Sequence, residues 1–119
     1  MGIGTMGGPN SIYGTVDLLI LKTLKVSGPM HGLGIAEEVH RVSGEELVVD
    51  DSALYPSLHR LERQGLVEGE WKISDRGRRA KFYELTPDGR LNLQEATESW
   101  IRHTDAVRKV LRFAWEDVR

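Results

Sequence analysis

The sequence predicts a mainly helical α+β fold, in which three short helices precede a two-stranded hairpin and one long helix. Apolar residues recur with helical spacing in three segments between residues 15 and 63. The period then changes to two over residues 67–73, which is the spacing of a β-strand. Residues 87–114 contain no helix breaker after Gly89, so we expect one helix there, about 42 Å long at 1.5 Å per residue.

The first two helices are expected on either side of Gly28-Pro29. Thr15 offers an N-cap, and the segment after it is apolar around most of its circumference, so we expect this helix at the centre of the core. The second helix is expected over residues 32–42, where one face is apolar and the other charged. Residues 1–14 hold five glycines and little apolar periodicity, and we interpret them as a flexible N-terminal arm.

The third helix is expected to begin at a cap formed by Asp50 or Asp51 and to end before Gly65. Its buried face is expected from leucines at i, i+4 and i+7 spacing, which are Leu54, Leu58 and Leu61. That assignment turns a polar, aromatic and cationic face of the helix toward solvent.

The hairpin is predicted from alternation and turn residues. Its first strand is expected to bury the face formed by Val67, Gly69, Trp71 and Ile73. Residues 74–78 are expected to form the turn, and residues 81–85 the returning strand. Thr86 then offers an N-cap, and Pro87 the first residue, of the long helix.

Composition excludes several classes of protein. At 119 residues and 13.4 kDa, the chain can form one domain with one core. It has no cysteine, so neither a disulfide nor a thiolate metal site can form. Its four histidines are scattered without a Ser/His/Asp group, so we predict no enzyme, no cofactor and no metal site. The apolar run at residues 18–21 is too short to span a membrane and no signal peptide precedes it, so we expect a cytoplasmic protein.

The charge distribution is more informative than the net charge of −2. Residues 52–82 hold seven bases against four acids, whereas residues 28–51 hold one base against six acids. A basic segment inside an acidic chain is typical of a localised nucleic-acid-binding surface. Chance clustering on a solvated face is the alternative that charge alone leaves open.

The order of these elements is that of a winged helix-turn-helix with a long C-terminal dimerisation helix. The outer face of the third helix suits the major groove of DNA, and we expect it to bind DNA through Ser52, Tyr55, Pro56, Ser57, His59, Arg60 and Arg63. The hairpin, or wing, is expected to contact the DNA backbone or minor groove through four bases within six residues, Arg76, Arg78, Arg79 and Lys81.

The long helix carries a seven-residue repeat that predicts pairing with a second copy. The expected dimerisation residues are Leu93, Ala96, Trp100, His103, Val107, Val110 and Ala114. The alternative is that this helix folds back on its own core, through Ile101, Leu111 and Phe113. We expect the first turns to pack within the chain and the later turns across a dimer.

Residues 52–66 (SALYPSLHRLERQGL) and 78–90 (RRAKFYELTPDGR) closely resemble the PadR family of transcriptional regulators. Residues 14–21 and 30–35 are similar to the first two helices of that family. The resemblance implies a homodimeric repressor that binds a pseudo-palindromic operator in double-stranded DNA. In some drug-responsive members an aromatic residue at the place of Trp100 lines a cleft between subunits, which implies a small aromatic effector there. Simple packing of Trp100 in the dimer interface is the alternative.

We therefore expect an arm at residues 1–14, a winged helix-turn-helix DNA-binding domain at 15–86 and a dimerisation helix at 87–119. The predicted function is sequence-specific regulation of transcription. The alternative is a winged helix used for protein–protein contact, which would keep the fold but would not need a basic wing.

Overall fold

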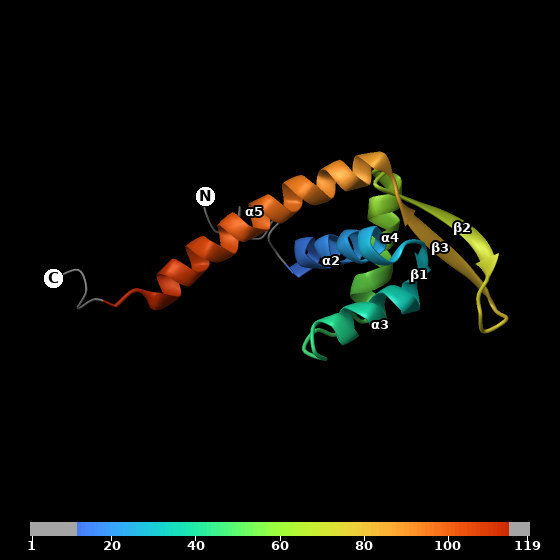
Figure 1. The fold of residues 1–119 in the computed structure, drawn as a ribbon, viewed down its shortest axis with the longest axis horizontal. Helices are drawn as coiled ribbons and strands as arrows, with labels where there is room; N and C mark the ends of the chain where they lie inside the picture. The colour runs from blue at the N-terminus through green and yellow to red at the C-terminus, as the bar shows by residue number, and fades with distance from the viewer. Residues whose placement is uncertain (1–11, 115–119) are drawn as a thin grey trace.

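The computed structural model describes residues 12–114 and has the predicted mainly helical α+β architecture. The wing and the free end of the last helix lie at opposite ends of the molecule (Figure 1). In chain order the elements are α2 (Ile12–Ser27), β1 (Met30–His31), α3 (Gly32–Val42), α4 (Asp51–Arg63), β2 (Val67–Ile73), β3 (Arg79–Leu85) and α5 (Pro87–Arg112). The predicted winged helix-turn-helix with a long C-terminal helix is therefore confirmed.

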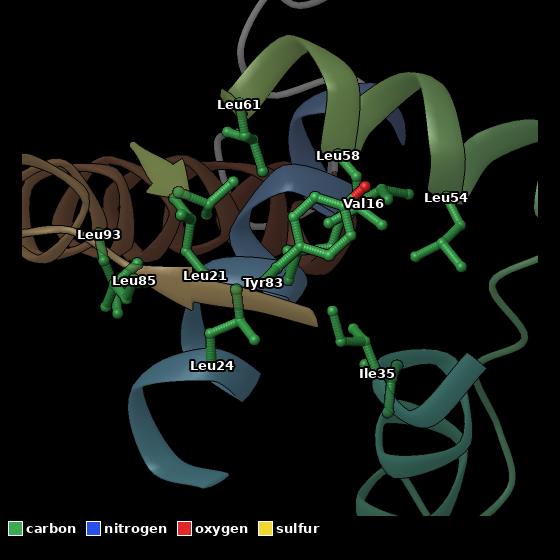
Figure 2. Packing of buried hydrophobic residues seen from close by; sticks show 13 residues of the cluster. Val16, Leu21, Leu24, Ile35, Leu54, Leu58, Leu61, Tyr83, Leu85 and Leu93 are labelled. Atoms are coloured by element: carbon green, nitrogen blue, oxygen red, sulfur yellow. The ribbon is translucent and has the colours of Figure 1, made fainter. Parts of the chain in front are cut away.

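The core lies where α2, α3, α4 and the sheet meet. Ile20 and Leu21 of α2 are fully buried, as expected for a central helix. The three leucines of α4 point from that helix toward Tyr83 and α2 (Figure 2), and they are fully buried, which confirms them as its inward face. Because this face is fixed by packing, the opposite face of α4 remains available to solvent.

The sheet is antiparallel and has the strand order β1-β3-β2. The sequence predicted β2 and β3 but not β1, which pairs His31 with Phe82. A strand of two residues leaves no periodic signal in a sequence, so this difference has a simple physical origin. β1 ties the start of α3 to the base of the wing.

Among the first three helices, one boundary differs from expectation. α2 begins at Ile12, so Thr15 lies inside the helix and is not its N-cap, and residues 12–14 are helix rather than arm. The rest of the expected arm, residues 1–11, lies outside the described residues. α3 has the predicted bounds. α4 is capped by Asp50, whose carboxylate accepts a hydrogen bond from the Ala53 N–H at 3.1 Å.

The buried face expected along β2 is found only at its first residue. Val67 is buried, but 56% of Trp71 and 68% of Ile73 is exposed to solvent. Alternation identified one face of the strand correctly, but it could not show where the core ends. The wing projects away from the helices that form the core (Figure 1). Apolar and aromatic side chains on its outer half are therefore exposed to solvent.

The long helix α5 is joined firmly to the winged domain at its start. The Thr86 hydroxyl accepts a hydrogen bond from the Gly89 N–H at 3.0 Å and donates one to the Gly65 carbonyl at 2.7 Å. Gly89 is buried, and a Cβ there would collide with the Leu66 carbonyl oxygen. Leu93 is buried in the core.

Beyond Leu93, no residue of α5 is buried in the described part of the chain. Ile101, Leu111 and Phe113 are exposed, so they do not fold back onto the core. The helix ends at Arg112, two residues before the expected end. Within residues 12–114, no helix combines the length and the apolar character needed to cross a membrane.

Candidate nucleic-acid interface

A hollow of about 800 Å³ lies between α4 and the wing, which is formed by residues 67–85. It brings together six of the predicted DNA-binding residues: Tyr55, His59, Arg76, Arg78, Arg79 and Lys81. The complete lining is His31, Gly32, Leu33, Tyr55, His59, Trp71, Ser74, Arg76, Arg78, Arg79, Ala80, Lys81 and Tyr83. Four cations at the wing side of one concave surface give it the positive charge that a nucleic-acid backbone requires.

The two faces of the wing differ in charge. Residues paired directly across antiparallel strands share a face, and Trp71 pairs with Lys81 on the face toward the hollow. On the opposite face, Glu68 pairs with Glu84, and both line a second, acidic depression together with Glu70. A polyanion is therefore attracted to the wing from the side of the hollow and repelled from the other side.

The tip of the wing is held by backbone hydrogen bonds. The Ser74 N–H donates to the Arg78 carbonyl at 2.7 Å, and Gly77 adopts a φ of 75°, which favours glycine. Arg76 lies 3.8 Å from a Glu37 carboxylate oxygen, and both side chains are more than half exposed. An exposed pair at that distance contributes little, so Arg76 can exchange it for a phosphate.

Tyr55 occupies the side of the hollow formed by α3 and α4. A Cβ at Gly32 would lie 2.9 Å from the Tyr55 ring, so glycine lets the ring lie against the start of α3. Sequence reasoning gave Gly32 no such role, because the two residues are distant in the chain. Pro56 and His59 are exposed on the same helix. These side chains are therefore open to solvent on the outer face of α4.

Two serines near the start of α4 behave differently. Ser52 is exposed, and its hydroxyl donates to an Asp50 carboxylate oxygen at 2.7 Å, which lowers the pKa of that carboxyl together with the Ala53 N–H. Ser57 is fully buried, so its expected contact with DNA is wrong. The helical position of Ser57 lies beside the leucine face, and its hydroxyl accepts a hydrogen bond from Arg60 at 3.2 Å.

Arg60 is tied to α2 rather than directed into the hollow. Its Nη2 atom lies 2.6 Å from Oδ1 of Asp17, and both side chains are partly buried. We expected Arg60 to be free to bind DNA, and the sequence did not reveal that its side chain pairs with Asp17. Arg63, one turn further along α4, is exposed, but it does not line the hollow.

Lys81 joins the wing to α4. Its Nζ atom lies 2.9 Å from a Glu62 carboxylate oxygen, and this hydrogen bond raises the pKa of the Lys81 ammonium group. The same ammonium lies 5.6 Å from the centroid of the Tyr83 ring. A Cβ at Gly69 would collide with the end of the Lys81 side chain, so glycine there leaves a path for Lys81 to reach Glu62.

The expected effector residue lies far from this hollow along α5. Trp100 is partly buried, and its ring centroid lies 5.9 Å from that of His103. Within residues 12–114, no group of three or more His, Cys, Asp or Glu residues could hold a metal ion.

The fold and its basic hollow define a winged helix-turn-helix transcriptional regulator. The model of the transcriptional regulator PadR-like family matches residues 20–95, and the chain belongs to that family. The chain is 39% identical over 66 residues to the transcriptional regulator Rv3488 of Mycobacterium tuberculosis. That match covers 56% of this chain and 58% of the relative, less than two thirds of its length.

Solved structures of similar proteins agree with this assignment. A transcriptional regulator from Clostridium thermocellum has a TM-score of 0.74 and 26% identity, over 84% of this chain and 96% of that one. A PadR family transcriptional regulator from Eggerthella lenta has a TM-score of 0.70 and 26% identity, over 95% of this chain and 96% of that one. These proteins are regulators of transcription and not enzymes, as expected for this chain.

Proposed function

We propose that the protein is a homodimeric, sequence-specific DNA-binding repressor that acts in the cytoplasm on a pseudo-palindromic operator. In this proposal α4 lies in the major groove and the wing contacts the adjacent backbone. The observation that supports it is the hollow between the two elements, which has four cations on its wing side. The proposed contacts are Ser52, Tyr55, Pro56, His59 and Arg63 from α4, and Arg76, Arg78, Arg79 and Lys81 from the wing.

The experiment begins by selecting bound fragments from a genomic library. Affinity for the best fragment is then measured at several salt concentrations for the native protein and for Arg78→Ala/Arg79→Ala. Each lost phosphate contact lowers the slope of log K against log salt by about one unit, so a decrease of about two is expected. The matched control is Lys22→Ala/Lys25→Ala, which removes two exposed bases of α2 that do not line the hollow.

An unchanged slope and affinity in the wing variant would contradict the proposal. It would favour the alternative in which this winged helix binds a protein. Tyr55→Phe and His59→Ala test specificity separately. They are expected to reduce the ratio of operator affinity to random-duplex affinity more than they reduce affinity for random DNA.

We infer that the later turns of α5 form the dimer interface. Leu93 is buried within its own chain and therefore does not belong to this surface. The proposed residues are Ala96, Trp100, His103, Val107, Val110 and Ala114. The support is that 73% of Val110 is exposed although it is apolar and lies on the predicted seam.

Truncating α5 would also remove Leu93 from the core, so a substitution tests the dimer more cleanly. Val110→Glu is expected to give a folded monomer in analytical ultracentrifugation, because it places two like charges in the seam and nothing in the core. Lys109→Glu introduces the same residue on a neighbouring helix position and is expected to remain dimeric. A dimer of undiminished stability in Val110→Glu would contradict this interface.

We also propose that a small planar aromatic effector binds between subunits at Trp100. The support is an aromatic ring on the proposed seam, beside a second ring from His103. Binding that separates the two long helices would change the distance between the two copies of α4, which must lie about 34–36 Å apart to read successive turns of DNA. The effector must bind the DNA-incompetent dimer more tightly, since equal affinities shift nothing.

The test is a fluorescence titration of planar aromatic compounds against the native protein and Trp100→Ala, followed by operator binding with and without the compound. Trp71 and Trp115 give background signal, which makes the variant the necessary control. Quenching that persists in Trp100→Ala, or binding without a change in operator affinity, would contradict the effector site.

A further inference from the structure

Trp71 is a large aromatic residue on the hollow side of the wing, yet it is more than half exposed. The guanidinium carbon of Arg79 lies 4.9 Å from the centroid of its ring. The two residues lie on facing strands, because Trp71 pairs with Lys81 and Ile73 pairs with Arg79 on the same face of the hairpin. The wing therefore places a cation over an indole ring before any DNA is bound.

We propose that Trp71 is a positioning residue that holds the guanidinium of Arg79 in the orientation that binds a DNA phosphate. The inference rests on the proposed DNA-binding function and extends it to an uncharged side chain. A stacked guanidinium keeps its N–H donors in the plane of the group and free at its edge. Such a fork binds two oxygens of one phosphate.

Arg79 differs from two other cations of the wing in its partners. Arg76 pairs with Glu37, and Lys81 pairs with Glu62, so a carboxylate partly neutralises each of them. Among residues 12–114, no ion pair involves Arg79. Its orientation is thus fixed by an aromatic ring, while its full charge remains available to a phosphate.

Preorganisation explains how an uncharged residue can affect affinity for DNA. A free arginine side chain has many rotamers, and binding restricts it to one of them. Contact with Trp71 imposes that restriction before DNA arrives, so less conformational entropy is lost on binding. Lysine at position 79 would keep the charge but would lose the planar stack and the two-pronged contact.

The test compares Trp71→Leu, Arg79→Lys and the double variant, with Arg90→Lys as the matched control, because Arg90 is exposed on α5 and does not line the hollow. Affinity is measured on the selected operator and on random duplex at several salt concentrations. We expect Trp71→Leu and Arg79→Lys each to lower affinity about three- to tenfold on both duplexes, with little change in salt slope, because no charge is removed. The double variant is expected to lose no more affinity than the single variant that binds DNA more weakly, and Arg90→Lys is expected to stay within about twofold of the native protein.

Two further measurements separate positioning from folding. Trp71→Phe keeps an aromatic face and is expected to recover most of the lost affinity. Thermal unfolding of Trp71→Leu is expected to match that of the native protein, because Trp71 lies outside the core cluster. Native affinity in Trp71→Leu, independent losses that multiply in the double variant, or a loss confined to the operator would overturn the inference. If the native protein bound no duplex at all, the proposed function would fail first.

Discussion

The ion pair between Arg60 and Asp17 gives the sharpest distinction between a structural cation and a DNA-binding cation. The perturbation is Arg60→Ala, compared with Arg78→Ala. Arg60 joins α4 to α2 through its contact with Asp17 at 2.6 Å and a second hydrogen bond to Ser57 at 3.2 Å. Arg78 is exposed and lines the hollow. The two substitutions remove the same charge from different places.

The expected magnitude follows from the surroundings of the pair. The side chains of Arg60 and Asp17 are 33% and 24% exposed, so solvent screens the pair only in part. Arg60→Ala also leaves the fully buried hydroxyl of Ser57 without its donor. When the charge-assisted hydrogen bond is discounted for this screening, it and one unsatisfied buried group together amount to about 2 kcal/mol of unfolding free energy. For a chain of this size, that corresponds to a fall in Tm of roughly 8 °C.

The assay is urea and thermal unfolding at one fixed protein concentration, since the proposed dimerisation would make apparent stability depend on concentration. Operator binding is measured in parallel over a range of salt concentrations. Arg60→Ala is expected to lower stability and to leave the salt slope unchanged. Arg78→Ala is expected to leave stability unchanged and to lower the salt slope. An unchanged Tm in Arg60→Ala, together with a slope lowered by about one unit, would refute the structural role and restore Arg60 to the DNA interface.

Two further predictions concern the contact between the wing and α4, and the start of α5. Gly69→Ala is expected to displace Lys81 from Glu62 and to weaken operator binding more than random-duplex binding in a gel-shift assay, because the wing changes its angle to α4; equal losses on both duplexes would contradict this. Thr86→Ala removes both the N-cap of α5 and the hydrogen bond to Gly65, and is expected to cost about 1–2 kcal/mol in urea unfolding. Thr86→Ser keeps the hydroxyl and is expected to stay close to the native protein, so equal destabilisation of both variants would contradict the role of that hydroxyl.

The order and bounds of most elements could be predicted because each depends on local signals. The cap at Asp50, the left-handed Gly65 and the start of α5 at Thr86 all lie within a few residues of the helix end they define. The start of α2 was predicted wrongly, because Thr15 is a good cap by type but lies inside a longer helix. Local chemistry cannot decide between two compatible starts when the flanking residues are also able to form a helix.

The sequence allowed the positive charge of the candidate site and its place between α4 and the wing to be predicted. It did not allow the contacts between side chains within the site to be predicted. Basic residues of the wing and Tyr55 of α4 line one hollow, as the order of elements implied. The partner of Arg60 is 43 residues away in the chain, so no local pattern could reveal it. The exposure of Trp71 depends on how far the wing extends beyond the core, and alternation along a strand carries no information on that distance.

The most direct test of the central claim is the ratio of affinities for the selected operator and for random duplex, measured with the native protein at physiological salt. Sequence-specific regulators bind their sites about a thousandfold or more tightly than random DNA. The account predicts a ratio of at least that order, and a marked fall in affinity for both duplexes in Arg78→Ala/Arg79→Ala. Equal affinity for the two duplexes, or a wing variant that binds as the native protein does, would contradict it.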